Sequence, residues 1–219
     1  MYELGMNSVR VVHYQHSNEE IDLFDKLGIT VWSEVGVVDE ILSPNDSNYN
    51  KFINVTKAQI TELVKQQYNH QSIVVWGLGN EIRRKMSSSF SKTAGDNADS
   101  HDIATDYHEK MNALVKELDP THQTTYTAFC LFNRSKDWDS DTAAMNLYPY
   151  WYTNGMDKWY LNQKSMSGIM TADFKVLDNA NSAKPLRISE YGSGGETGFL
   201  CPYEADRTDK CGKTYPDEE

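Results

Sequence analysis

The sequence has 219 residues, a mass of 25.0 kDa and a formal charge of −11, from 21 Lys and Arg against 32 Asp and Glu. This acidic balance argues against a partner that is DNA or RNA, which normally needs a basic surface, and against docking on an anionic membrane. No apolar run reaches the roughly 18 residues of a membrane span, and the mean hydropathy is −0.65. With 39% hydrophobic and 11% aromatic residues, the chain can form a globular core.

The two ends carry no visible targeting signal. Residues 2–5 lack the basic and apolar regions of a signal peptide, and residues 215–219 lack a lipidation motif. We therefore expect both ends to be cuts inside a larger protein. The cysteines, Cys130, Cys201 and Cys211, form no CxxC pair, which argues against structural zinc. Whether Cys201 and Cys211 pair or stay as free thiols is left open.

The first third of the chain alternates between strand and helix patterns. In chain order we expect a strand over residues 7–14, a helix over 18–27, a strand over 29–34, a polar loop over 43–50, a helix of about 15 residues that ends near Tyr68, and a strand over 72–78. Gly28 follows the first helix at the position where a C-terminal cap is usual.

The rest of the chain continues the alternation. We expect a surface insertion over residues 86–100, a helix over 102–118, strands over 123–128 and 143–148, a helix near 167–180, and a strand over 186–191. The helix before residue 120 is predicted to stop at Asp119-Pro120, because proline cannot continue it.

This order predicts a parallel sheet built from βαβ units. The predicted strands finish in residues that suit a site, namely His13, Glu34, Glu81, Tyr148 and Glu190. In a (β/α)8 TIM barrel the active site lies at the carboxyl ends of the strands. A doubly wound open sheet would bring a glycine-rich first turn, and we find none. We therefore expect an α/β fold, an incomplete TIM barrel that holds about strands 2–7 of eight and lacks strands 1 and 8.

Two predicted strands end in a carboxylate that follows a turn-forming pattern. Glu81 closes the motif Trp-Gly-Leu-Gly-Asn-Glu, whose two glycines predict a tight turn, and Glu190 lies in Ile-Ser-Glu-Tyr-Gly. Paired carboxylates are the usual apparatus of glycoside hydrolysis, one as proton donor and one as nucleophile or base. Taken alone, the pattern also fits two ordinary loop carboxylates.

Four motifs in order resemble glycoside hydrolase family 2, the β-galactosidase and β-glucuronidase group of retaining TIM-barrel enzymes. They are Asn-Ser-Val-Arg-Val-Val-His-Tyr at 7–14, Trp-Gly-Leu-Gly-Asn-Glu at 76–81, Asn-Leu-Tyr at 146–148 followed by Trp-Tyr at 151–152, and Ile-Ser-Glu-Tyr-Gly at 188–192. The resemblance covers residues 7–192. It implies that the whole chain is part of a catalytic TIM barrel, with β-sandwich domains upstream.

The resemblance also implies roles for single residues. Glu81 would be the general acid/base and Glu190 the nucleophile that forms a covalent glycosyl-enzyme. The substrate-binding residues that it implies are Asn80, which would bond the sugar 2-hydroxyl, Asn146, Tyr148 beside Glu190, Arg10 and His13 in the sugar pocket, and Trp151 against a sugar face. Trp151 fits a core position equally well.

One position departs from some members of the family. Certain β-galactosidases bind Mg²⁺ through a Glu and a His in the loop after the strand that ends here at Glu34. The corresponding positions hold Val38 and Glu40. We therefore expect no essential metal and no cofactor.

The interpretation that follows is a retaining exo-β-glycosidase for terminal β-galactosides, with a β-linked oligosaccharide or glycoside as substrate. The alternatives are a β-glucuronidase of the same family and a catalytically silent carbohydrate-binding fragment. A homo-oligomer of the whole protein, its compartment and its natural linkage stay open.

Overall fold

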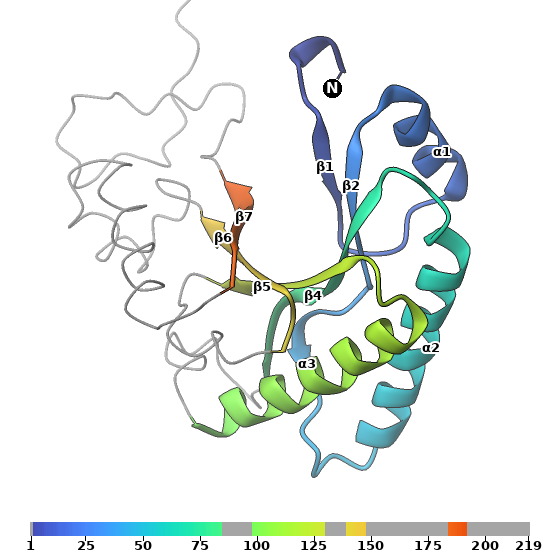
Figure 1. Cartoon of the computed structure of the whole chain (residues 1–219). Helices are drawn as coiled ribbons and strands as arrows, with labels where there is room; N and C mark the ends of the chain where they lie inside the picture. The colour runs from blue at the N-terminus through green and yellow to red at the C-terminus, as the bar shows by residue number, and fades with distance from the viewer. Residues whose placement is uncertain (1, 85–97, 130–138, 148–183, 192–219) are drawn as a thin grey trace, which may run out of the picture.

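The computed structural model describes residues 2–84, 98–129, 139–147 and 184–191, which form a curled parallel sheet with helices on one side (Figure 1). The described elements are the short 3-10 helix η1 (Tyr2–Leu4), β1 (Ser8–Val11), α1 (Asn18–Leu27), β2 (Thr30–Glu34), β3 (Val38–Ile41), α2 (Tyr49–Gln67), β4 (Ile73–Arg84), α3 (Ala98–Leu118), β5 (Gln123–Phe129), β6 (Thr142–Leu147) and β7 (Leu186–Tyr191).

The sheet has the strand order of a barrel wall. Its main path is β1-β2-β4-β5-β6-β7, and every neighbouring pair is parallel. Parallel neighbours in chain order require a crossover between them, and α1, α2 and α3 lie in the first three crossovers on the outer face of the curl. The chain therefore forms part of a TIM barrel, which confirms the predicted fold class. The β-sandwich domains upstream stay a prediction.

The sheet also contains a strand that the sequence pattern did not predict. β3 pairs in parallel with the far half of β4, where Val38 lies opposite Asn80 and Glu40 opposite Arg83. β4 is correspondingly longer than predicted, because it continues to Arg84 instead of ending near residue 78. The segment after Glu34 is thus held against the Asn80-Glu81 segment.

Helix α1 shows why its boundaries were readable from sequence. The Ser17 hydroxyl caps the first turn by accepting a hydrogen bond from the Glu20 backbone N–H (3.3 Å). Gly28 ends the helix in the left-handed conformation, with φ 67° and ψ 30°. Between these caps, Ile21 and Phe24 are buried against the sheet.

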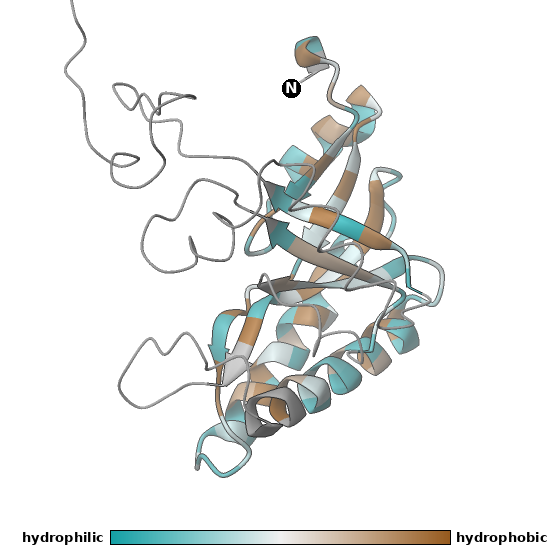
Figure 2. Ribbon diagram, turned by 90° about the vertical axis from the view of Figure 1, so that its left-hand side faces the viewer, coloured by the Kyte–Doolittle hydropathy of each residue, from teal (hydrophilic) through white to brown (hydrophobic). Residues whose placement is uncertain are grey.

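The main core lies between the helices and the outer face of the sheet. It combines helix residues such as Ile60 of α2 and Met111 of α3 with strand residues such as Val31. Hydrophobic and hydrophilic residues alternate along the helices, as expected when one side of each is buried (Figure 2). A smaller buried cluster, Trp32, Val75 and Ala144, contains strand residues alone.

Some boundaries differ from the prediction, and some predicted features fall outside the described residues. Helix α3 begins at Ala98, so the predicted insertion over 86–100 is wrong at its end. Helix α2 has 19 residues instead of about 15. The predicted helix near 167–180, Tyr148, Trp151 and the three cysteines lie outside the described ranges.

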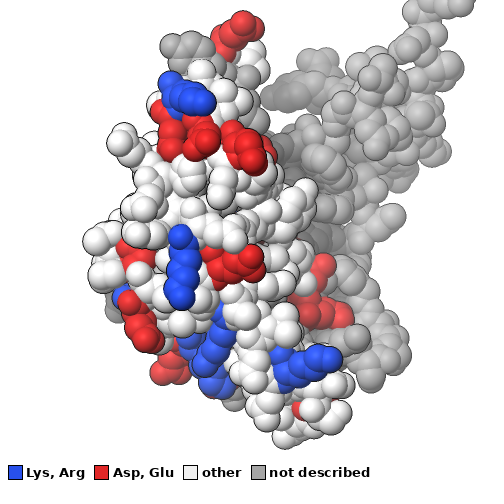
Figure 3. Space-filling view, turned by 90° about the vertical axis from the view of Figure 1, so that its right-hand side faces the viewer, with Lys and Arg blue, Asp and Glu red and all other residues white. Residues whose placement is uncertain are grey.

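Acidic and basic side chains are interspersed on the face formed by the helices (Figure 3). Within the ranges that the structure describes, no helix has the length and apolar character needed to cross a membrane.

Candidate active site

The candidate residues lie in the carboxyl-terminal halves of their strands. Arg10 is the third residue of β1, Glu34 the last of β2, Asn80 and Glu81 lie in the second half of β4, and Asn146 and Glu190 in the last residues of β6 and β7. Because all strands run in the same direction, these ends meet at one edge of the sheet. The topology therefore gathers side chains that are up to 180 positions apart in the chain.

Arg10 is the centre of the cluster. Its Nη1 donates to Glu190 Oε1 (2.6 Å). Its Nε and Nη2 donate to Glu34, with Nε–Oε2 at 3.0 Å and Nη2–Oε1 at 2.9 Å. Nη2 also donates to Asn80 Oδ1 (2.9 Å), so a single guanidinium joins β1, β2, β4 and β7. Charge-assisted bonds of this kind are the strongest hydrogen bonds that side chains make.

The acid/base candidate Glu81 is held by a neighbouring amide. Asn146 Nδ2 donates to Glu81 Oε1 (2.6 Å) and to Asn80 Oδ1 (3.3 Å). The ionised Glu81 carboxylate can only accept, so the amide nitrogen of Asn146 faces it, and Asn146 Oδ1 accepts from Ser189 Oγ (2.7 Å). Asn146 also lies opposite Glu190 in the register of β6 and β7. The two candidate carboxylates are thus joined through one polar network.

His13 follows β1 and lies beside both Glu34 and Glu190. Its Nδ1 is 3.1 Å from Glu34 Oε1, and its Nε2 is 3.7 Å from Glu190 Oε1. A carboxylate can only accept, so Nδ1 carries the proton toward Glu34. The hydrogen bond with Glu34 raises the pKa of His13 above its ordinary value, although partial burial opposes the shift.

The glycines of the Trp-Gly-Leu-Gly-Asn-Glu motif act differently from the prediction. They lie inside β4 rather than in a turn. A Cβ at Gly77 would lie 2.4 Å from Trp32 Nε1 and 2.8 Å from Glu34 Oε2, so only glycine admits these side chains. Gly79 has φ 143° and Glu81 has φ 52°, both in the region that L side chains rarely adopt. The backbone that carries Glu81 is therefore strained, as is common at functional sites.

Glu34 is the residue whose importance sequence reasoning missed. The strand-end pattern pointed to it, but no role followed, because its partners come from β1 and from the segment after β1. The predicted sugar-pocket residues Arg10, His13, Asn80 and Asn146 are brought together with Glu81 and Glu190.

Elsewhere among the described residues, three side chains lie close enough together that they could hold a metal ion. Ligand atoms of Asp22, Asp25 and His70 lie within 4.8 Å of one another. Asp25 already accepts from the Ser72 backbone N–H and from His70 Nδ1, both at 2.7 Å. This set lies between α1 and the start of β4, at the opposite end of the strands from Glu190. The hydrogen bonds of Asp25 explain why these side chains lie together without a metal ion.

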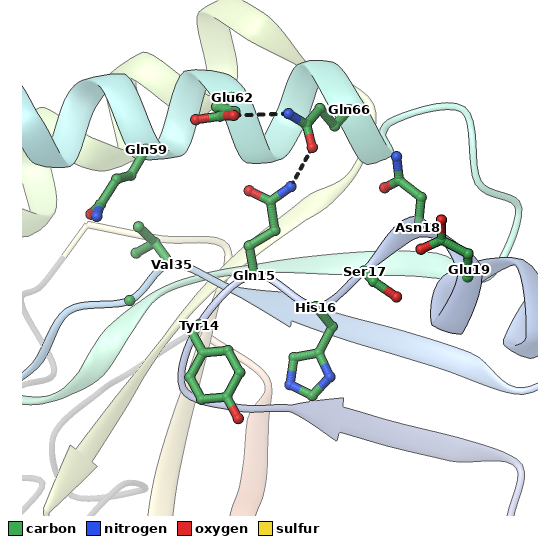
Figure 4. Close-up of a pocket in the computed structure, with 11 residues that line it drawn as sticks. Tyr14, Gln15, His16, Ser17, Asn18, Glu19, Val35, Gln59, Glu62 and Gln66 are labelled. Carbon is green, nitrogen blue, oxygen red and sulfur yellow. Dashed lines mark hydrogen bonds between the residues drawn. The ribbon is translucent and has the colours of Figure 1, made fainter.

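Beside the carboxyl ends of the strands there is an open hollow of about 610 Å³ between the segment after β1, the end of β2 and helix α2 (Figure 4). Its polar wall is internally bonded, since Gln15 donates to Gln66 (2.7 Å) and Gln66 to Glu62 (2.9 Å). Val35 and Gly36 form part of its lining, whereas Glu34, Arg10 and Glu190 do not. It is therefore separate from the cluster around Arg10.

Residues 1–210 match the family model described as glycosyl hydrolases family 2, TIM barrel domain. The chain belongs to glycosyl hydrolase family 2. The match covers more than nine-tenths of the sequence and includes every residue of the cluster around Arg10. The family resemblance expected from the four motifs is confirmed.

Curated relatives and a solved structure agree with this family. A β-glucuronidase of Bacteroides fragilis is 30% identical over 203 residues, which cover 89% of this chain and 24% of the relative. A β-glucuronidase of Streptococcus agalactiae is 30% identical over 207 residues, which cover 87% of this chain and 31% of the relative. The family 2 β-galacturonidase of Eisenbergiella tayi, solved bound to glycerol, is 27% identical with a TM-score of 0.67, over 92% of this chain and 32% of that one.

Two consequences follow for the expectations from sequence. The chain spans about a quarter to a third of the length of these relatives, in agreement with the expected partial barrel. Their names favour the β-glucuronidase alternative over the β-galactosidase that we first expected, so the finer substrate prediction needs revision.

Proposed function

We propose that the whole protein carrying this chain is a retaining exo-β-glycosidase whose substrates are terminal β-glucuronides. The observation that carries the proposal is the Arg10 network, which joins Glu190 and Asn80 and, through Asn146, Glu81 in a family 2 barrel. The β-glucuronidase names of the 30% identical relatives support the choice of a uronide over a galactoside.

In this reaction Glu190 is the nucleophile. Its ionised carboxylate attacks the anomeric carbon, and the bond from that carbon to the leaving oxygen breaks. Arg10 aims the carboxylate through the 2.6 Å bond to Oε1 and balances its charge. The product of the first step is a glycosyl ester on Glu190, in which the carboxylate charge is gone.

Glu81 serves both steps as the proton carrier. It donates a proton to the leaving oxygen in the first step and takes one from water in the second, when water attacks the ester. Asn146, fixed by Ser189, holds Glu81 Oε1 in place through both steps. Asn80, whose Oδ1 accepts from Arg10, presents its amide donors to the sugar 2-hydroxyl.

The test compares substrates and variants in the whole protein. We expect kcat/KM for 4-nitrophenyl β-glucuronide to exceed that for the β-galactoside by at least about 100-fold, because a site built for a charged group rejects an analogue that lacks it. A higher kcat/KM for the galactoside would restore the first interpretation, and a preference for β-galacturonide would move the proposal to that substrate.

The roles of the carboxylates are tested separately. Glu190→Gln should remove turnover, and Glu81→Ala should lower kcat by about 10²- to 10⁴-fold on a substrate that needs protonation. Azide should restore the Glu81→Ala rate and give a β-glycosyl azide. Glu20→Gln is the matched control, because Glu20 is an exposed glutamate of α1 whose side chain bonds His16. A protein that hydrolyses no glycoside would support the silent carbohydrate-binding alternative instead.

A further inference from the structure

Glu34 is a carboxylate that the proposed mechanism does not use. Both of its oxygens accept from Arg10, at distances of 2.8 to 3.0 Å, and Oε1 also lies 3.1 Å from His13 Nδ1. Arg10 and His13 both also face Glu190. One buried carboxylate therefore binds two groups that also contact the nucleophile.

Exposure separates Glu34 from the groups that can meet a substrate. The exposed fraction of the side chain is 0% for Glu34, 7% for Arg10, 21% for Glu190 and 32% for His13. Glu34 is thus the fully buried member of these four side chains, and a sugar cannot reach it. Its effect on the reaction must pass through Arg10 and His13.

Glu34 is also fixed from behind by the sheet. Gly77, its register partner on β4, leaves room for its Cγ and Oε2, which would lie 2.8 Å from any Cβ at that position. The ring of Trp32, two residues earlier on β2, covers the Arg10 guanidinium at 4.7 Å from the ring centroid. These contacts hold the Glu34 carboxylate in a single position.

The charges around His13 explain what this arrangement does. The groups that face His13 are Glu34, Arg10 and Glu190. Arg10 carries the fixed positive charge of this group, and Glu34 and Glu190 are carboxylates bonded to it. When Glu190 becomes an ester in the proposed reaction, Glu34 keeps its charge and its bonds to Arg10 and His13, which holds both side chains in position until water attacks.

We propose that Glu34 is a positioning residue that holds Arg10 and His13 against the nucleophile Glu190 through both steps of the reaction. This inference rests on the proposed function. Glu34 makes no contact with substrate, so its loss should lower kcat with little change in KM.

The test substitutes Glu34 in the whole protein. The histidines of that protein carry a ¹³C label at Cε1, so that the titration of His13 can be followed by NMR. Glu34→Gln removes the charge and replaces one acceptor oxygen with an NH₂ group that opposes Arg10. Glu34→Asp keeps the charge and withdraws it by one methylene. Glu20→Gln is the control, because it removes a carboxylate from a different histidine, His16, at 2.9 Å. His13→Gln assigns the His13 resonance.

In Glu34→Gln we expect a lower pKa of His13, since the Glu34 hydrogen bond is the main cause of its upward shift. We expect kcat to fall roughly 10- to 100-fold, the loss typical of one charge-assisted hydrogen bond, while KM changes little. Glu34→Asp should keep part of the raised pKa of His13 and still lower kcat. Glu20→Gln should change neither the pKa of His13 nor kcat.

Two results would overturn the proposal. One is a His13 titration in Glu34→Gln that matches the parent. The other is a folded Glu34→Gln whose kcat matches the parent, since a purely structural role would reduce stability alone. If Glu34→Gln does not fold, an unchanged kcat in Glu34→Asp is decisive. If the parent hydrolyses no glycoside, the proposed function fails, but the His13 titration still decides whether Glu34 holds His13.

Discussion

Gly77→Ala tests how tightly the site is built. The added methyl carbon would lie 2.4 Å from Trp32 Nε1, and 2.8 Å from both Glu34 Cγ and Glu34 Oε2. Comfortable contacts between heavy atoms begin near about 3.5 Å, so the methyl is about 1 Å too close to the indole. Both neighbours are buried, and Glu34 is bonded to Arg10, so neither can move cheaply.

The sign of the effect follows from comparing two magnitudes. Alanine is favoured over glycine inside a strand by roughly 0.5–1 kcal/mol. Forcing a methyl into a packed interior costs about 1–3 kcal/mol, and disturbing a charge-assisted bond to Glu34 costs about 1.5–3 kcal/mol. The net loss in free energy of unfolding should therefore be about 3 kcal/mol, with a fall in kcat because Arg10 loses its support.

The assay is urea unfolding of parent and variant with the slope m compared. Gly36→Ala is the matched control, because a Cβ there meets its nearest atoms at ordinary distances of 3.5 to 3.8 Å. Its stability should stay within about 0.5 kcal/mol of the parent. Equal midpoints for Gly77→Ala and Gly36→Ala would refute the reasoning that Gly77 exists to admit Glu34 and Trp32.

Two further predictions concern stability away from the site. Gly28→Ala should cost about 1 kcal/mol in urea unfolding, because Gly28 has φ 67° and a Cβ there would meet no atom within 4 Å, so only backbone strain remains; an unchanged midpoint would argue against the left-handed cap. Asp119 accepts hydrogen bonds from Trp76 Nε1 (2.8 Å) and from Thr121, and although burial raises its pKa, these bonds hold it well below the ordinary value. The stability that Asp119 contributes is thus present above the unfolded pKa of about 3.9 and is lost as pH falls below it. Asp119→Ala should lower stability by roughly 2 kcal/mol at pH 6, since it leaves the buried Trp76 N–H without its acceptor, and the difference from the parent should shrink by pH 3; a constant difference would contradict the assigned cause.

Local signals made the framework predictable. Helix α1 was readable because Ser17 and Gly28 cap it and Ile21 and Phe24 repeat on one side. The strand ends were readable because β-branched runs stop at polar residues, and parallel topology brings such ends together.

What the sequence left unseen depends on contacts between distant segments. β3 has four residues with mixed polarity, and it exists because β4 continues beyond its predicted end to pair with it. The role of Glu34 likewise depends on Arg10 reaching across from β1. In the sequence Gly77 looks like a turn former. In the structure a glycine is needed there because the Glu34 side chain packs against its Cα.

The most direct test of the account is the site of covalent trapping. The whole protein is treated with 2-deoxy-2-fluoro-β-glucuronyl fluoride, and with the galactosyl analogue in parallel, and the labelled peptide is identified by mass spectrometry. We predict that the glucuronyl reagent labels Glu190, that the label is lost in Glu190→Gln, and that the galactosyl reagent reacts far more slowly. A label on Glu81 or Glu34, or no covalent adduct during turnover, would contradict the account.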